Sequence, residues 1–246
     1  MNRFFTDQPL TQGSTATLPA SVRKHAIQVL RLQEGAQIEV VSRNHQAFVA
    51  TILDVDPLTV RVDQPITRPV ELLVAVHLLC GIPKGDKAEL IVQKATELGA
   101  MHISFFNSQW ATAKWQAPRV AKKLARLAAI AQGAAEQSHR CFVPAVDVVT
   151  LNEITQLTAD AKLVAYEESG KAGEAAALVQ ALKTRPSTLV CVFGPEGGLS
   201  PAEIATLTAS GFTTAGLGPR ILRTETAPLY LLSAVSALTE LQGESE

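Results

Sequence analysis

From Val70 onward the sequence alternates between short apolar runs and segments with a helical period, and this alternation restricts the fold more than any other feature. Four of the runs are apolar almost throughout, as expected of strands that are buried on both faces of a sheet. These runs are residues 71–80, 102–106, 162–166 and 188–193. Alternating strands and helices of this kind predict an α/β domain with a mostly parallel sheet.

The segments between these runs are expected to be helices with one apolar face each. In residues 86–99, Asp86 and Glu89 have the spacing of an N-terminal capping box. The core face of this helix is predicted to be Ala88, Ile91, Val92, Ala95 and Leu98. The last helix, residues 226–241, is apolar on nearly all sides, so we expect it to be buried in the domain or in a dimer interface.

The first 68 residues have a different pattern, in which short β segments surround a single helix. The helix is expected between Pro19 and Gly35, with Ser21 as its N-cap and Gly35 as its C-terminal stop. This organisation predicts a small barrel or sandwich capped by a helix. The domains are therefore expected to be residues 1–68 and 69–246, with the boundary near Pro65–Pro69.

Composition places few limits on the partner of the chain. The net charge is −1, but residues 81–140 hold nine Lys or Arg against four acids, whereas residues 141–246 hold six against twelve. A basic middle segment fits a nucleic-acid partner, although solvated helix faces give the same pattern. The same ambiguity applies to one face of the helix after Pro118, which carries Arg119, Lys122, Lys123 and Arg126.

The cellular compartment is inferred from two further features. No apolar run approaches the roughly 20 residues of a membrane span, and the N-terminal residues lack the apolar core of a secretory signal. Cys80, Cys141 and Cys191 are widely spaced and odd in number, which favours buried thiols over a disulfide framework. These features predict a cytoplasmic protein without a membrane partner.

Two glycine-rich passages follow predicted strands in the C-terminal half. The first, FGPEGGLSPAEI, places Gly194, Gly197 and Gly198 in a turn, and Ser200 opens a helix with Glu203 at capping-box spacing. Such a turn at the carboxyl end of a strand is either a ligand loop or simply a tight connection. It is neither a P-loop nor a GxGxxG dinucleotide motif.

The second passage, GLGPRILRTETAPLY, places Arg220, Arg223 and Glu225 between another glycine turn and the apolar last helix. Isolated charges in such surroundings are costly. A site that binds an anion or stabilises developing negative charge is therefore the preferred interpretation.

Together these passages closely resemble the C-terminal signature of the RsmE family of methyltransferases. RFF at 3–5, HAIQVLR at 25–31, KGDKAELIVQKATELG at 84–99 and AAEQSHR at 134–140 resemble the family's other motifs, in the same order. The one departure is Pro228, where the family more often has a small residue. We expect only a local adjustment there, because proline is tolerated in the first turn of a helix.

The resemblance implies a PUA-like β-barrel RNA-binding domain followed by a SPOUT methyltransferase domain with a deep trefoil knot. It implies methylation of N3 of a uridine in 16S rRNA of the small ribosomal subunit, with S-adenosylmethionine as methyl donor and S-adenosylhomocysteine as product. A homodimer is also implied, and no metal is expected. The alternatives are another SPOUT enzyme, such as a ribose 2′-O-methyltransferase, and a non-catalytic RNA-binding protein of the same fold.

Residue roles are assigned by the same resemblance. The residues expected to contact the cofactor are Gly194, Glu196, Gly197, Leu217, Gly218, Ile221, Leu222 and Thr224. Arg223, and next Arg220, are expected to stabilise charge on the uridine, while Glu225 is a proton acceptor, orients an arginine or, preferably, caps the last helix. The residues expected to contact RNA are His25, Arg31, Lys84, Lys87, Lys94 and Arg140.

Overall fold

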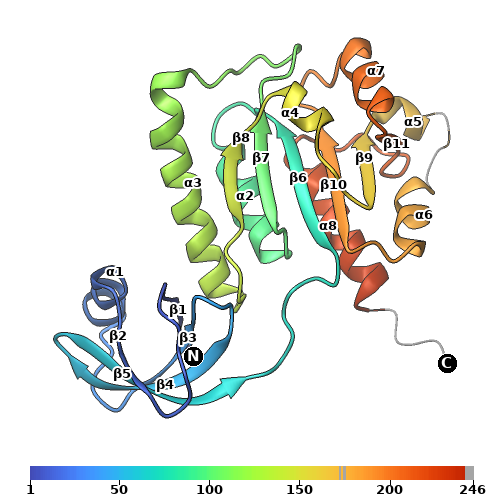
Figure 1. Ribbon diagram of the computed structural model, residues 1–246. Coiled ribbons are helices and arrows are strands. Elements are labelled where there is room, and N and C mark those ends of the chain that lie inside the picture. Colours follow the sequence, from blue (N-terminus) through green and yellow to red (C-terminus); the bar gives the residue numbers. More distant parts are fainter. Residues whose placement is uncertain (172, 174–175, 242–246) are drawn as a thin grey trace, which may run out of the picture. The chain divides into compact units, whose positions relative to one another are not determined.

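The computed structural model describes residues 1–171, 173 and 176–241 (Figure 1). Its contacts divide the chain into two compact units. One consists of residues 1–71 and 135–142, and the other consists of residues 72–134 and 143–246. The second unit corresponds to the part of the sequence in which strands and helices alternate.

The first unit is built on one five-stranded sheet with the strand order β1-β3-β4-β5-β2. The strands are β1 (Arg3–Phe5), β2 (Thr15–Thr17), β3 (Gln37–Val41), β4 (Ala47–Val55) and β5 (Leu58–Ile66). All pairs are antiparallel except β1 with β3. Strand β5 extends past Pro65 to Ile66, into the region where the sequence predicts the domain boundary. The proline is tolerated because β2 pairs only with residues 59–61, so β5 has a free edge at Pro65.

The helix of this unit differs from the prediction. Helix α1 (Ala20–Arg23) is only one turn long and passes into a π-helical segment, η1 (Lys24–Val29). Ser21 is not the N-cap: Pro19 occupies that position and its fixed φ favours entry into the first turn. The helix ends before Gly35, at Leu30, and Arg31 then takes a positive φ of 55°. Val22 and Ala26 remain buried against the sheet.

Residues 135–142 group with the first unit because two arginines attach them to it. Arg3 is buried, bonds Glu39 at 2.8 Å through Nε, and donates to the backbone oxygen of Arg140 at 3.1 Å. Arg140 is also buried, and its Nε lies 2.9 Å from a carboxylate oxygen of Glu71. These bonds join positions that are far apart in the sequence.

The second unit contains a six-stranded sheet with the order β11-β9-β10-β6-β7-β8, in which every pair is parallel. Its strands are β6 (Ala75–Gly81), β7 (His102–Phe106), β8 (Ala145–Val148), β9 (Ala161–Ala165), β10 (Thr188–Phe193) and β11 (Thr213–Ala215). The parallel α/β prediction is confirmed. Strand β6 begins at Ala75 rather than at Glu71, whose carboxylate pairs with Arg140 instead.

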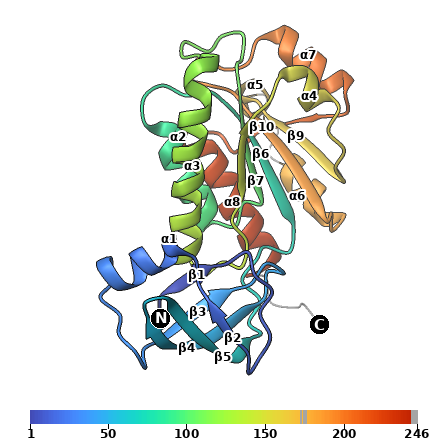
Figure 2. The same ribbon diagram turned by 60° about the vertical axis from the view of Figure 1, so that its left-hand side comes forward.

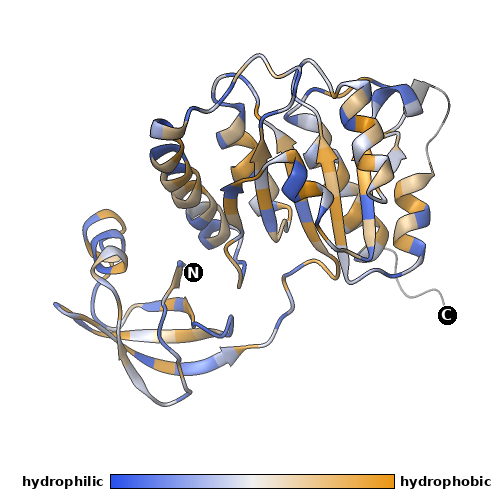
Figure 3. Ribbon diagram, turned by 45° about the horizontal axis from the view of Figure 1, so that its top comes forward, coloured by the Kyte–Doolittle hydropathy of each residue, from blue (hydrophilic) through white to orange (hydrophobic). Residues whose placement is uncertain are grey.

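Helices cover both faces of this sheet (Figures 1 and 2). One face packs against α2 (Lys87–Glu97), α3 (Ala117–Gln137), α6 (Ala177–Lys183) and α8 (Thr226–Thr239). The other packs against α4 (Leu151–Thr155) and α7 (Pro201–Ala209), and α5 (Glu167–Lys171) follows β9. Figure 3 shows the apolar residues concentrated along the central strands of the sheet. No helix in the described ranges is long and apolar enough to cross a membrane.

Three details of these helices differ from the sequence-based expectations or refine them. Asp86 occupies the N-cap position of α2 but makes no side-chain capping bond, and Glu89 pairs with Arg126 instead, so the predicted capping box is wrong. Helix α8 is buried along one face, while Tyr230 is 40% exposed, so it is not enclosed by its own chain. Pro228 lies buried in the first turn of α8, where its missing N–H costs nothing.

Candidate active site

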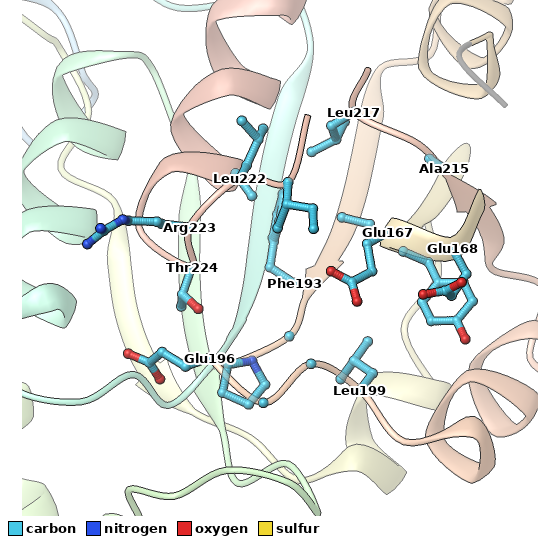
Figure 4. A pocket seen from close by; sticks show the side chains of 18 of the residues that line it. Glu167, Glu168, Phe193, Glu196, Leu199, Ala215, Leu217, Leu222, Arg223 and Thr224 are labelled. Carbon is cyan, nitrogen blue, oxygen red and sulfur yellow. The ribbon is translucent and has the colours of Figure 1, made fainter. Parts of the chain in front are cut away.

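A cavity of about 760 Å³ lies where β9, β10 and β11 end. Its walls come from the segments that follow these three strands, namely residues 165–168, 193–199 and 215–224, with Lys87, Trp110, Pro201 and Ala227 at their margins. Ligands of open parallel sheets bind at the carboxyl ends of strands, and a cavity of this size suits a nucleoside-sized molecule. Figure 4 shows the side chains that line it.

The glycines of the 194–198 turn are needed because the backbone is crowded there. A Cβ atom on Gly197 would lie 2.6 Å from the backbone oxygen of Trp110, and one on Gly194 would lie 3.0 Å from the backbone of Gly198. Gly81, at the end of β6, is equally restricted, because its Cβ would lie 2.5 Å from the Pro195 ring. The turn is therefore both a tight connection and a wall of the cavity.

All of the residues expected to contact the cofactor line this cavity. They are Gly194, Glu196, Gly197, Leu217, Gly218, Ile221, Leu222 and Thr224. The structure adds Trp110 and identifies Glu167 in the turn after Tyr166, a turn that the resemblance implies is part of the cofactor pocket. In Figure 4 the side chain of Glu167 extends toward the middle of the cavity. Its place directly after a buried strand was the signal that could have identified it, whereas no sequence pattern singles out Trp110.

Arg220 and Arg223 lie on the exposed part of the cavity wall. In Figure 4 the side chain of Arg223 extends away from the cavity interior, where a guanidinium can meet a second substrate. Glu225 is not among the lining residues. It occupies the N-cap position of α8 but makes no side-chain capping bond, so the preferred capping role is not seen.

The carboxylate of Glu225 is instead paired with Lys87, whose Nζ lies 3.1 Å from Oε2. Burial alone would raise the pKa of Glu225. A backbone hydrogen bond, the Lys87 ammonium and the charge of Arg223 outweigh that effect and lower the pKa below its usual value. Glu225 is thus held as a carboxylate, and a lowered pKa makes it a weak proton acceptor.

Lys87 also forms an ion pair with Glu196, in which its Nζ lies 2.9 Å from Oε1. The backbone N–H of Lys84 donates to this oxygen as well, at 3.1 Å. Burial would raise the pKa of Glu196, but these hydrogen bonds and the lysine charge lower it. The negative charge of Glu196 is therefore compensated by the ammonium of Lys87, the first residue of α2, and by the backbone N–H of Lys84 in the loop before it.

The six residues expected to contact RNA are divided between the two units. His25, Arg31 and Arg140 belong to the first unit, whereas Lys84, Lys87 and Lys94 belong to the second. Arg31 and Lys84 are exposed, and His25 is half-exposed and packs edge-on against Phe4.

The other three are engaged in ion pairs within their own units. Lys87 bridges Glu196 and Glu225, and Lys94 pairs with Glu97 at 2.8 Å. Arg140 is 2% exposed and pairs with Glu71, which leaves its guanidinium inside the unit. Burial and pairing of this kind favour a structural role for Arg140 over a phosphate contact.

The side chains that the structure describes do not form a metal site. Among residues 1–171, 173 and 176–241, no group of three or more His, Cys, Asp or Glu side chains has the arrangement to hold a metal ion. Cys80 and Cys191 are fully buried, and burial raises the pKa of the Cys80 thiol to about 12. Neither thiol is suited to nucleophilic chemistry.

Models of two protein families match the chain. A family described as an RNA methyltransferase domain matches residues 70–236, and one described as an RNA methyltransferase PUA domain matches residues 18–63. The first match includes every residue that lines the cavity.

Similar proteins and structures agree with these matches. The ribosomal RNA small subunit methyltransferase E of Bacillus subtilis (strain 168) is 41% identical over 251 residues, which cover 98% of each chain. The structure of a protein of that name from Neisseria gonorrhoeae, bound to S-adenosyl methionine, is 29% identical with a TM-score of 0.85 and covers 97% of this chain and 98% of its own. A putative methyltransferase from Legionella pneumophila with bound cofactor SAM is 28% identical with a TM-score of 0.82, and 96% of each chain is covered.

Proposed function

The chain belongs to the ribosomal RNA small subunit methyltransferase E family, and from this premise we propose that it methylates N3 of one uridine in 16S rRNA. It is an S-adenosylmethionine-dependent rRNA methyltransferase with an N-terminal PUA domain and an α/β methyltransferase domain. The observation that carries the proposal is the placement of Arg220 and Arg223 on the exposed wall of a cavity formed by two glycine-rich turns and the segment after β9.

The residues around the cavity fit S-adenosylmethionine. The crowded glycine turn presents backbone groups, the side chains of Leu217, Ile221 and Leu222 supply apolar surface, and Glu167 supplies a carboxylate for hydroxyl or amino groups. When bound, the cofactor supplies an electrophilic methyl group and its own leaving group. The chain then has to orient the acceptor base and exclude water.

The acceptor nitrogen of uridine must lose its proton before it becomes an effective nucleophile. A guanidinium remains charged at all relevant pH values, so Arg223 is suited to stabilise negative charge on the pyrimidine oxygens, with Arg220 beside it. Glu225 keeps its negative charge next to Lys87 and is proposed to influence Arg223 electrostatically rather than accept the proton.

The remaining features of the proposal concern the whole assembly. The target base leaves its stack to enter the cavity, as other base-modifying enzymes require, and the N-terminal domain, residues 1–68, binds surrounding RNA. His25, Arg31, Lys84 and Lys94 are proposed as RNA contacts. We also propose a cytoplasmic homodimer whose C-terminal segment forms a trefoil knot. The resemblance to the family supports both the homodimer and the knot, and the exposed side of α8 supports the homodimer.

The test is methyl transfer from labelled S-adenosylmethionine to small ribosomal subunits that lack the modification, followed by nucleoside analysis. We expect 3-methyluridine from the wild-type chain. Arg223→Ala is expected to lower the rate by about 10²–10³-fold, as for other residues that stabilise developing charge. Binding of S-adenosylhomocysteine should remain within a few-fold, because the Arg223 side chain extends away from the cavity.

Lys183→Ala serves as the charge-matched control, since Lys183 is exposed in the last turn of α6 and does not line the cavity. A label on a ribose would contradict N3 methylation and indicate a 2′-O-methyltransferase. Cofactor binding without any label would indicate a different RNA or assembly state as substrate, whereas a chain that bound no S-adenosylhomocysteine would support the non-catalytic alternative.

A further inference from the structure

Lys87 joins three segments of the chain at the edge of the cavity. It is the first residue of α2 and follows the loop after β6. Its Nζ lies 2.9 Å from Oε1 of Glu196, in the turn after β10, and 3.1 Å from Oε2 of Glu225, directly before α8. Lys87 lies more than 100 residues before Glu196 and Glu225 in the sequence, and the segments that carry these two carboxylates form walls of the cavity.

The Glu225 carboxylate depends on this lysine. Its Oε2 is shielded from solvent and, among the described residues, has no well-aligned hydrogen bond, so the nearby ammonium compensates it through charge rather than through directed bonding. A buried carboxylate without a counter-charge is costly. The hydrogen bond to Glu196, and next the adjacent carboxylate of Glu225, in turn raise the pKa of Lys87, which keeps it protonated.

The consequence for the cavity follows from the position of Glu225. It directly follows Arg223 and Thr224, both of which line the cavity, and Glu196 lies in the turn that forms the adjacent wall. A displacement of either carboxylate would therefore move a wall. Because the ammonium is shared by two carboxylates, it is also poorly placed to neutralise an RNA phosphate.

We propose that Lys87 is a positioning residue of the cofactor site, which holds the 194–198 turn against the 217–225 segment by bridging Glu196 and Glu225. This role replaces the RNA contact that the sequence motif suggested for Lys87. The identity of the ligand rests on the proposed function, whereas the bridge itself rests on the distances from Nζ of Lys87 to the two carboxylates.

A double-mutant cycle measured by calorimetric titration with S-adenosylhomocysteine tests this role. We expect Lys87→Met to raise Kd about tenfold, because Glu225 is left unpaired. The double variant Lys87→Met with Glu225→Gln should bind more tightly than Lys87→Met alone, because the neutral amide no longer needs a cation. Lys87→Arg should restore most of the affinity, a rescue that loss of packing alone would not produce.

Arg126→Met is the matched control, because it removes a cation that pairs with α2 at 2.7 Å but lies away from the cavity. Thermal unfolding of each variant verifies that it is folded.

The role is overturned if Lys87→Met binds S-adenosylhomocysteine within twofold of wild type, or if the effects of the two single variants on Kd simply add. Unchanged cofactor binding with weaker, less salt-dependent rRNA binding would identify a phosphate contact instead. A wild-type chain that bound no S-adenosylhomocysteine would overturn the proposed function, independently of the bridge.

Discussion

At the scale of single residues, the second unit contains a polar group whose protonation opposes folding. His77 on β6 and His102 on β7 stack with ring centroids 4.0 Å apart. His77 bonds the Ser104 hydroxyl at 2.7 Å, and Asp147 on β8 lies 2.9 Å from His102. Burial, followed by the charge of His102, lowers the pKa of His77 to about 4, although Asp147 acts in the opposite direction.

His77 should therefore make stability depend on pH in a defined window. The unfolded chain takes up this proton near pH 6.5, whereas the folded chain does so only near pH 4. The stabilising contribution of the neutral ring is present above pH 6.5 and decreases as the pH falls toward 4. At about 1.36 kcal/mol per pKa unit the loss is at most about 3 kcal/mol, and solvent at the half-buried ring reduces it to about 2 kcal/mol.

Urea unfolding between pH 4 and 7 measures this loss. His77→Gln, which retains a hydrogen-bonding group for Ser104, should lose less stability over the same interval than the wild type. The pKa of Asp147 is lowered below its ordinary value of 3.8: burial would raise it, but hydrogen bonds from His102 and Ser104 outweigh that effect. The stability that the Asp147 carboxylate contributes is therefore lost only at a pH below the window in which His77 takes up its proton. Equal slopes for wild type and variant would contradict the assignment to His77.

At the scale of secondary structure, two helices of the second unit begin with complete capping boxes in different surroundings. Thr150 and Glu153 start α4 at the surface, and Ser200 and Glu203 start α7 in the interior. Glu203 is 6% exposed and also accepts hydrogen bonds from the Ser108 hydroxyl and the Gln109 N–H. Its carboxylate thus connects the loop after β7 to the start of α7.

This difference predicts unequal costs for the same substitution. Glu153→Ala should lower the free energy of unfolding only slightly, because water can replace the bonds that its exposed carboxylate makes with Thr150. Glu203→Ala should lower it by about 3 kcal/mol, because it leaves buried donors without an acceptor in addition to removing the cap. Chemical denaturation of the two variants gives the comparison. Equal costs would mean that water replaces the bonds of Glu203.

The two outcomes for predicted capping boxes show what could be inferred from the sequence. Ser200 and Glu203 were predicted correctly, because both partners lie within one turn and no other charge competes for the carboxylate. Asp86 and Glu89 have the same spacing, but Glu89 pairs with Arg126 of another helix. Strand order, the start of β6 and the bridge at Lys87 likewise depend on distant residues, so local patterns could not reveal them. The cavity-lining glycines were identifiable because turn chemistry is local.

At the scale of the whole molecule, ion pairing decides which basic side chains can face an RNA phosphate. Several basic side chains are neutralised locally, as Arg3 is by Glu39 and Arg140 by Glu71. These pairs join residues 36 and 69 positions apart, and sequence analysis therefore counted Arg140 as available to RNA. Only the exposed cations contribute to the field that a phosphate backbone encounters.

Salt dependence of rRNA binding therefore distinguishes the exposed cations from the paired ones. Arg31 in the first unit and Lys84 in the second are both exposed. If each contacts a phosphate, Arg31→Gln and Lys84→Gln should each weaken binding several-fold at low salt and reduce the slope of log K against log salt by about one. Lys183→Gln, which removes an exposed charge from the last turn of α6, should leave the slope unchanged.

Fluorescence anisotropy with a 16S rRNA fragment over a salt series measures the slopes of all three variants. Equal slopes for wild type, Arg31→Gln and Lys84→Gln would mean that RNA contacts a different surface, because counterion release depends on the number of phosphates neutralised and not on the net charge of the protein.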